Sequence, residues 1–274
     1  MKQISILGCG WLGLPLAKSL LKKGFSINGS TTSVEKIAVL EKAGISAFQI
    51  NLFEDRIEGN LDLFLSNSDV LIIDIPPKLR GDSKENFVAK IQNIIPFIEK
   101  SSVEKVIFVS STSVYADDNS IITEETKPNP DTESGKQLLE AEQLLQSNKN
   151  FQTTIVRFGG LIGEERHPIK FLAGRKNIEN PEGPINLIHQ RDCIGIIEAI
   201  LKHPETSGQN DKSSEVFNAV APFHPTRKGY YTQKAIELNL PLPEFEESKP
   251  SIGKTILSDK VASVLNYEFK KKTL

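Results

Sequence analysis

The chain has 274 residues, of which 38% are apolar and 25% charged, so it can bury the core of an ordinary globular protein. Its net charge is −2 and its basic residues are scattered, whereas binding to nucleic acid or to a membrane surface needs a concentrated basic face. Its two cysteines and four histidines lack the spacing of metal ligands or of a disulfide scaffold.

The N-terminus carries an apolar run that resembles the start of a secretory signal. Such a signal runs about 15–30 residues before its cleavage site, but only eight residues precede Cys9. The longest later runs, DVLIIDIPP and IGIIEAIL, are far shorter than the ~20 residues of a membrane span. We therefore expect a cytoplasmic protein without a nucleic-acid, membrane or metal partner.

Strand-like and helix-like segments alternate along the first half of the chain. Expected strands cover residues 4–7, 25–29, 47–52, 69–75, 105–111 and 153–158, and expected helices cover residues 12–21, 34–42, 86–100 and 133–147. The strand segments at 69–75 and 105–111 are almost wholly apolar, as expected for strands that are buried on both faces of a parallel sheet. The alternation predicts an α/β fold with a doubly wound parallel sheet of the Rossmann type.

The first strand and the first helix are joined by the glycine-rich turn GCGWLG. In this G-x-G-x-x-G pattern, Gly8 permits a tight turn, Gly10 lets the backbone approach a pyrophosphate, and Gly13 lets the helix pack closely on the sheet. The helix N-terminus then offers free N–H groups to the phosphates. We therefore expect NAD(P) to bind at Gly8, Gly10, Trp11, Leu12 and Gly13; the alternative is a tight turn without a ligand.

The end of the second strand distinguishes NAD from NADP. A site that prefers NAD places Asp or Glu about 20 residues past the glycines, where the acid binds the ribose hydroxyls. Here the segment GSTTSVEK offers the hydroxyl groups of Ser30, Thr31 and Thr32, with Lys36 close behind and no acid at that position. This favours NADP, because hydrogen-bond donors replace a charge that would repel a 2′-phosphate. Ser33 is also expected to cap the following helix.

Further stretches follow in chain order: FVSSTSVYAD, EETKPNP, SGKQLLEAE, RFGGLIG and NLIHQRDCIGIIEAIL. With them the chain resembles the extended, atypical short-chain dehydrogenase/reductases of the NAD-dependent epimerase/dehydratase family, and looks most like their YeeZ-type bacterial members. The resemblance implies a Rossmann domain over residues 1–163 and a small substrate lobe over residues 164–274, with residues 186–220 returning to the sheet. It also implies a homodimer that pairs through two helices.

The resemblance also implies a catalytic set, in which Ser/Thr, Tyr and Lys side chains reach the nicotinamide. Ser111 falls at the Ser/Thr position and Lys136 at the lysine of the Tyr-x-x-x-Lys motif, where it would contact the nicotinamide ribose. Thr132 stands where the family has tyrosine. A phenol with a pKa of about 10 can be activated by a nearby ammonium group, whereas a threonine hydroxyl cannot serve as a general acid or base. Lys136 could instead pair with Glu140 on the helix surface.

Other residues could replace the missing phenol. Tyr115 follows the strand that carries Ser111, so we place it in the catalytic set, with packing in a turn as the alternative. Further candidates, each with a structural role as the alternative, are His167, His189, Tyr230 and Tyr231.

Ligands of open α/β sheets bind in the loops at the carboxyl ends of the strands. We therefore expect further cofactor contacts from Ile75, Pro76, Ser110 and Phe158. In the substrate lobe, an anionic substrate such as a nucleotide-sugar could meet Arg166, Lys170 and Arg175, with simple solvation of these side chains as the alternative.

Two apolar stripes mark the helices at 86–100 and 133–147 as the expected dimer interface, the alternative being that they only face the core. Their residues are Ile91, Ile94, Ile98, Leu138, Ala141 and Leu145. Two classes of function remain: an NAD(P)-dependent reductase, epimerase or dehydratase acting on a hydroxylated or carbonyl small molecule, and a non-catalytic NAD(P)-binding sensor or regulatory protein. Ser111 and Lys136 favour the enzyme, since a protein that only binds the cofactor has no need of them.

Overall fold

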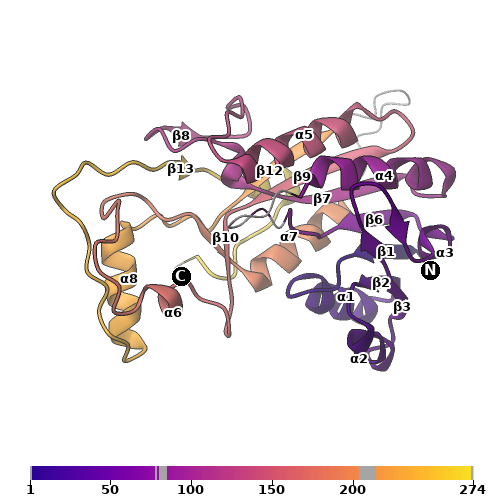
Figure 1. Ribbon diagram of the computed structural model, residues 1–274, viewed down its shortest axis with the longest axis horizontal. Helices are drawn as coiled ribbons and strands as arrows, with labels where there is room; N and C mark the ends of the chain where they lie inside the picture. Colours follow the sequence, from indigo (N-terminus) through magenta and orange to yellow (C-terminus); the bar gives the residue numbers. More distant parts are fainter. Residues whose placement is uncertain (1, 78, 80–84, 204–213, 273) are drawn as a thin grey trace.

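A parallel sheet of seven strands runs through the computed structural model, which describes residues 2–77, 79, 85–203, 214–272 and 274 (Figure 1). Every neighbouring pair of strands is parallel, and the doubly wound α/β prediction is confirmed. Across the sheet the strands are β12 (Glu215–Ala219), β9 (Gln152–Phe158), β7 (Lys105–Ser111), β6 (Val70–Ile73), β1 (Gln3–Leu7), β2 (Ser26–Thr31) and β3 (Ser46–Gln49).

The strand order reverses between β1 and β6. From β1 the sheet grows through β2 to β3 on one side, and from β6 through β7 and β9 to β12 on the other. Ligands of open α/β sheets bind at such a switch point, in the crevice outside the carboxyl ends of the strands. Gly8 follows β1 and Asp74 follows β6, so both residues lie at this point.

Helices cover both faces of the sheet, which is why its strands are apolar on both sides. One face is covered by α1 (Gly13–Lys22), α2 (Ile37–Lys42), α7 (Gln190–Lys202) and α9 (Asp259–Leu265), and the opposite face by α3 (Leu61–Leu65), α4 (Phe87–Lys100) and α5 (Glu133–Ser147) (Figure 1). Successive side chains of a strand point to opposite faces, so Ile72 joins the first core while Leu71 and Ile73 join the second. Within the described ranges, no helix combines the length and the apolar character that crossing a membrane requires.

Several expected elements are shorter than the sequence indicated, and the strand expected at 69–75 is β6 alone. The strand expected at 47–52 ends at Gln49, after which β4 (Asn51–Leu52) forms an antiparallel hairpin with β5 (Ile57–Glu58). The helix expected at 34–42 begins as a 3₁₀ turn, η1 (Val34–Lys36), and becomes α-helical only in α2. These differences arise at element ends, where local hydrogen bonding decides the boundary.

The two apolar stripes of α4 and α5 face the interior, so the interpretation of the stripes as an exposed interface was wrong. All six residues are at most 4% exposed and pack in the core between these helices and the sheet. An amphipathic pattern shows that one face of a helix is buried, but it does not distinguish a core from a partner subunit.

A second unit stands beside the carboxyl ends of the strands. Its core unites β10 (Gly160–Ile162), α6 (Ile169–Leu172), β11 (Leu187–His189) and α8 (Arg227–Glu237). A short parallel pair, β8 (Ile121–Ile122) with β13 (Thr255–Ile256), connects the C-terminal part of the chain to the loop after β7. Within the segment expected to return to the sheet, α7 and β12 do so, and residues 204–213 lie outside the described residues.

The chain after residue 258 packs against the Rossmann core, a placement that the sequence did not suggest. Val261, Leu265 and Phe269 join the core under α7. The carboxylate of Asp192, which is fully buried in the first turn of α7, accepts hydrogen bonds from the Tyr267 hydroxyl (2.8 Å) and from the N–H of Lys270 (2.6 Å). The segment following α9 is therefore fixed to the dinucleotide-binding half of the protein.

Candidate functional site

The turn after β1 requires glycine at two of its three glycine positions. Gly8 adopts φ +110°, and a Cβ built on it would lie 2.2 Å from the carbonyl oxygen of Asp74. A Cβ on Gly13 would lie 2.2 Å from the carbonyl oxygen of Gly8. The Gly8 N–H donates to Ser30 Oγ at 2.9 Å, which links the turn to the end of β2. These two glycines therefore give the turn its shape.

Gly10 differs from the other two, because no atom lies within 4 Å of the position that its Cβ would take. Beside it, the N–H groups of Trp11 and Leu12 donate no hydrogen bond within the described part of the chain. They precede α1, which begins at Gly13. Open space above Gly10 and free N–H groups at a helix N-terminus form a cradle that suits a diphosphate group. The residues present thus fit the dinucleotide expected from the sequence.

Asp74 is a site residue that the sequence analysis missed. Its carboxyl group lies against Gly13, whose N–H hydrogen-bonds to it. Burial raises the pKa of Asp74 to about 8, and the Gly13 N–H opposes this rise only in part. The carboxyl is therefore largely uncharged at neutral pH, so it does not strongly repel a diphosphate. An acid that ends an apolar strand at the switch point was the signal available in DVLIID.

Of the three hydroxyl groups expected to select NADP, two hydrogen-bond to the backbone and one is exposed to solvent. Ser30 and Thr31 are buried, and their oxygens accept the N–H groups of Gly8 (2.9 Å) and Ser33 (3.2 Å). Thr32 is exposed at the end of β2. The first two hydroxyls thus hold the local backbone, while Thr32 remains open to a ligand.

Ser33 and Lys36 complete this end of β2. Ser33 stands at the N-cap position of η1, but its hydroxyl donates to the Glu35 carboxylate, so the expected cap hydrogen bond is not made. Lys36 is exposed at the end of η1. A positive charge therefore lies near Thr32, with Glu35 held back by its contact with Ser33.

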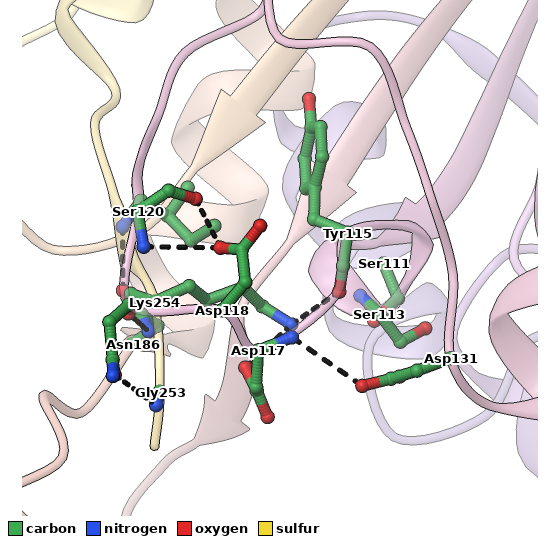
Figure 2. A network of polar contacts seen from close by, with 12 residues as sticks. Ser111, Ser113, Tyr115, Asp117, Asp118, Ser120, Asp131, Asn186, Gly253 and Lys254 are labelled. Atoms are coloured by element: carbon green, nitrogen blue, oxygen red, sulfur yellow. Dashed lines mark hydrogen bonds and ion pairs between the residues drawn. The ribbon is translucent and has the colours of Figure 1, made fainter. Parts of the chain in front are cut away.

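Ser111 and Lys136 come to the same edge of the sheet. Ser111 ends β7, and its Oγ accepts the Ser113 N–H at 3.2 Å (Figure 2). A Cβ on Gly135 would lie 2.2 Å from the Ser113 carbonyl oxygen, so α5 begins directly against the turn that follows Ser111. Lys136 is the next residue; it is exposed, and no ion pair with Glu140 forms among the described residues. The segments that carry the two residues assigned by the resemblance therefore pack against each other.

Thr132 lies just before α5 and serves as its N-cap. Its Oγ1 accepts the Gly135 N–H at 3.1 Å, and its backbone is extended. The hydroxyl at the position of the family tyrosine is therefore occupied by a structural hydrogen bond. Thr132 precedes the first residue of the helix, but its carbonyl oxygen accepts the Lys136 N–H at 3.0 Å, so it lies one turn before Lys136.

Tyr115 is not placed to act as the missing proton donor. Its ring points away from Ser111 and Asp131 (Figure 2), and only 1% of the residue is exposed. The hydroxyl accepts a hydrogen bond from Arg157 Nη1 at 2.6 Å and donates one to Asn218 Oδ1 at 3.1 Å. Burial raises the pKa of Tyr115 further from neutrality. The catalytic role expected for Tyr115 is not supported, because its phenol belongs to an interior network.

Ser110, one of the expected cofactor contacts, also belongs to this interior network. The Ser110 hydroxyl donates to the Glu142 carboxylate, which is ion-paired with Arg157, and all three residues are at most 5% exposed. Phe158 is likewise buried, whereas Ile75 is half-buried and Pro76 is exposed. The loop after β6 therefore offers surface to a ligand, while Ser110 and Phe158 support the sheet beneath it.

A cavity of about 240 Å³ lies between the two units of the fold. Thr112 and Asp117 line it from the Rossmann side, and Arg227 and Lys254 from the other. Lys254 Nζ donates to the Tyr115 carbonyl oxygen at 2.6 Å and pairs with Asp117 Oδ1 at 3.0 Å. Within the described part of the chain, the buried Nε of Arg227 has no hydrogen-bond partner, and Arg227 also lines a neighbouring cavity of about 300 Å³. The sequence analysis identified neither cation, because both reach the cavity from distant segments.

The residues expected to bind an anionic substrate are spread apart. Arg175 lines the second cavity together with Arg227. Lys170 donates to the Glu165 carbonyl oxygen at the surface, and Arg166 lies over the ring of Trp11. Only Arg175 of the three therefore lines a cavity of the second unit.

The remaining candidates have structural surroundings. His167 Nδ1 accepts the Ile169 N–H at 3.1 Å, its Nε2 hydrogen-bonds to Tyr230 Oη at 2.8 Å, and burial lowers the pKa of His167 to about 4. His189 caps α7 by accepting the Arg191 N–H. The tyrosines at 230 and 231 belong to the core of the second unit. These are the structural alternatives that the sequence left open.

The glycine turn, the switch point and the parallel sheet are those of a dinucleotide-binding protein. Comparison with known proteins agrees, because residues 8–187 match the family described as NAD(P)H-binding. The chain belongs to this family. The chain is 34% identical over 271 residues to Protein YeeZ of Escherichia coli strain K12, an alignment that covers 98% of this chain and 96% of that protein.

Solved structures of the NAD-dependent epimerase/dehydratase group share the fold. UDP-glucuronic acid 4-epimerase from Bacillus cereus in complex with NAD superposes with a TM-score of 0.76 at 17% identity, over 98% of this chain and 94% of that one. UDP-N-acetylglucosamine 4-epimerase from Bacillus cereus gives a TM-score of 0.75 at 16% identity, with the same coverage. At these identities the likeness establishes the fold, and the resemblance seen in the sequence is confirmed.

Proposed function

We propose that this chain is an NAD(P)-dependent reductase, epimerase or dehydratase that acts on a hydroxylated or carbonyl small molecule in the cytoplasm. The observation that supports the proposal is the contact between the start of α5, where Lys136 lies, and the turn after β7 that follows Ser111. Both residues lie at the carboxyl edge of the sheet, the edge where the Gly10 cradle opens.

Bound NAD(P) supplies hydride transfer in this chemistry. The Ser111 hydroxyl hydrogen-bonds to the reacting oxygen of the substrate, and the Lys136 ammonium group holds a ribose hydroxyl of the cofactor. Thr132 cannot exchange a proton near neutral pH, because its hydroxyl is not titratable in that range. The proton therefore passes to or from solvent.

The substrate in this proposal is an anion, possible examples being nucleotide-sugars. Support comes from Arg175 and Arg227 around one cavity and from Lys254 in the next. The buried Nε of Arg227, which lacks a partner, is a donor suited to a phosphate or carboxylate oxygen. Two of the solved structures with the same fold are named for UDP-sugar substrates.

We further propose NADP as the preferred cofactor and a homodimer as the working assembly. The exposed Thr32 and Lys36, without an acid at the end of β2, support the first. Calorimetric titration with NADPH and NADH tests it, and equal or tighter NADH binding contradicts it. For the dimer, α4 and α5 carry Ile95, Leu139 and Leu144, which pack against the core but remain only half-buried. A monomer mass in light scattering at micromolar concentration contradicts the dimer.

The test of the enzymatic proposal restores the missing phenol. Thr132→Tyr is expected to create or raise NADPH-dependent reduction of small carbonyl compounds by about 10²–10⁴-fold, the usual contribution of a general acid. Thr132→Ala is the matched control, because it removes the same helix cap, at a cost of about 0.5–2 kcal/mol, without supplying a phenol. Adding Ser111→Ala to the Thr132→Tyr variant removes most of the gain.

The alternative function is a non-catalytic NAD(P)-binding sensor or regulatory protein. It is supported by the cap role of Thr132 and by the interior position of the Tyr115 hydroxyl. If the wild type and Thr132→Tyr both bind cofactor but neither oxidises NADPH with any carbonyl compound or nucleotide-sugar, the sensor is favoured over the enzyme.

A further inference from the structure

Trp11, in the middle of the cradle, is contacted by residues from outside the turn. A Cβ on Gly163 would lie 2.9 Å from the indole ring at Cζ2, so the chain after β10 passes directly over this side chain. Gln190 Nε2 donates to the Trp11 carbonyl oxygen at 2.6 Å. The guanidinium carbon of Arg166 lies 4.9 Å from the centroid of the indole ring. The phosphate-binding turn is therefore held from the side of the second unit.

The backbone of Arg166 lies in a tight turn next to Trp11. The Gly163 N–H donates to the Arg166 carbonyl oxygen at 2.8 Å, and the Arg166 N–H donates to the Gly163 carbonyl oxygen at 3.1 Å. These two hydrogen bonds close the turn at the edge of the second unit. They place the start of the Arg166 side chain near Trp11, and the indole ring contacts its guanidinium end.

The guanidinium group of Arg166 is also uncommitted. Of the two acids that precede it, Glu164 pairs with Arg191 at 2.9 Å. Among the described residues, the guanidinium of Arg166 makes no ion pair and donates no hydrogen bond. An aromatic face attracts a cation without neutralising it, so the N–H donors along the edge of the guanidinium remain available.

We propose that Arg166 binds the diphosphate of the cofactor and so belongs to the dinucleotide site rather than to the substrate site. The cradle itself supplies only the N–H groups of Trp11 and Leu12, while a dinucleotide diphosphate brings two negative charges. A guanidinium group stacked on Trp11 adds a positive charge and a planar pair of donors that suits phosphate oxygens. Because the guanidinium group already lies on the indole ring, its binding to a phosphate costs less conformational entropy than the binding of a free side chain.

Calorimetric titration of the full chain with ADP-ribose, NADP⁺ and 2′-AMP tests this assignment, which rests on the proposed cofactor. Arg166→Met is expected to weaken ADP-ribose and NADP⁺ by about tenfold or more, the effect of losing a hydrogen-bonded charge. Binding of 2′-AMP, which lacks the diphosphate, stays within about twofold of the wild type. Arg166→Lys retains part of the affinity, because it keeps the charge but loses the planar donor pair.

Lys176→Met is the matched control, since it removes one charge from the same unit at a side chain that is 70% exposed and paired with Glu244. Unchanged ADP-ribose affinity in Arg166→Met overturns the proposal. Equal weakening of ADP-ribose and 2′-AMP also overturns it, because that result means that Arg166 only supports the shape of the turn. A wild-type chain that binds none of the three ligands contradicts the cofactor itself, which is a distinguishable failure.

Discussion

Gly10 and Gly13 have different surroundings, so a substitution at Gly10 is expected to affect cofactor binding and one at Gly13 to affect stability. Because a Cβ at Gly10 touches nothing, Gly10→Ala is expected to keep the thermal stability of the wild type while it weakens NADP⁺ binding at least tenfold by filling the cradle. Gly13→Ala puts a Cβ 2.2 Å from the Gly8 carbonyl oxygen, so it is expected to cost about 1–3 kcal/mol of stability. Thermal unfolding and calorimetry on both variants distinguish the effects. Unchanged NADP⁺ affinity in folded Gly10→Ala contradicts the cradle.

Asp74 gives the protein a stability that depends on pH. Its pKa is raised by burial from 3.8 to about 8, so below about pH 4 the carboxyl is protonated in both the folded and the unfolded chain. Between pH 4 and pH 8 the unfolded chain releases this proton while the folded chain retains it, so the contribution of Asp74 to stability falls as the pH rises. Asp74→Asn removes this dependence. The melting temperature of the variant minus that of the wild type is therefore expected to increase from pH 5 to pH 8.

The measurement for Asp74 is thermal unfolding of both proteins at fixed ionic strength. Parallel curves of melting temperature against pH would show that the carboxyl titrates normally.

At the scale of single residues, sequence reasoning found the three glycines because their chemistry is local to one turn. It missed Arg227 and Lys254, since only tertiary structure places them beside a cavity, and it passed over Asp74 although that acid ends an apolar strand.

Among the elements, α5 is held on the sheet by the buried ion pair of Glu142 with Arg157. Glu142→Gln leaves the Arg157 charge buried without a counter-charge, so it is expected to lower the free energy of unfolding by about 3–5 kcal/mol. Glu140→Gln, on the exposed side of the same helix, is expected to change it by less than about 0.5 kcal/mol. Urea denaturation measures both variants. Equal stability of the two variants would mean that the pair does not anchor α5.

The elements themselves were the most predictable part of the fold. The bounds expected for α5, β7 and α4 agree with the structure to within a residue, because long periodic segments carry their own signal. The apolar stripe on α4 was assigned to a partner subunit, but it packs in the core of its own chain. The periodicity of a helix shows that one face is buried and does not show what covers that face. The N-cap role of Thr132 could also be predicted in outline, because Thr stands directly before the expected helix and is a preferred N-cap residue.

In the molecule as a whole, the two units meet through contacts that no single segment could reveal. The cavity between them combines Thr112 and Asp117, which follow β7, with Arg227 in α8 and Lys254 before β13. The doubly wound sheet could be predicted because its strands and helices alternate in order along the chain. The return of α9 to the Rossmann core could not, because its short apolar pattern fits either unit equally well.

The pairing of β8 with β13 can form only late during synthesis, because the two strands lie far apart in the sequence. Ile121 and Ile122 leave the ribosome first, and their partners Thr255 and Ile256 follow 134 positions later. At the usual rate of about 5–20 residues per second, this separation corresponds to about 7–27 seconds of synthesis. During that interval the backbone of Ile121 and Ile122 has no strand beside it, and the apolar side chain of Ile122, buried in the finished protein, remains in water. Until β13 is synthesised, the nascent chain therefore exposes a short unpaired strand that chaperones and neighbouring nascent chains can bind.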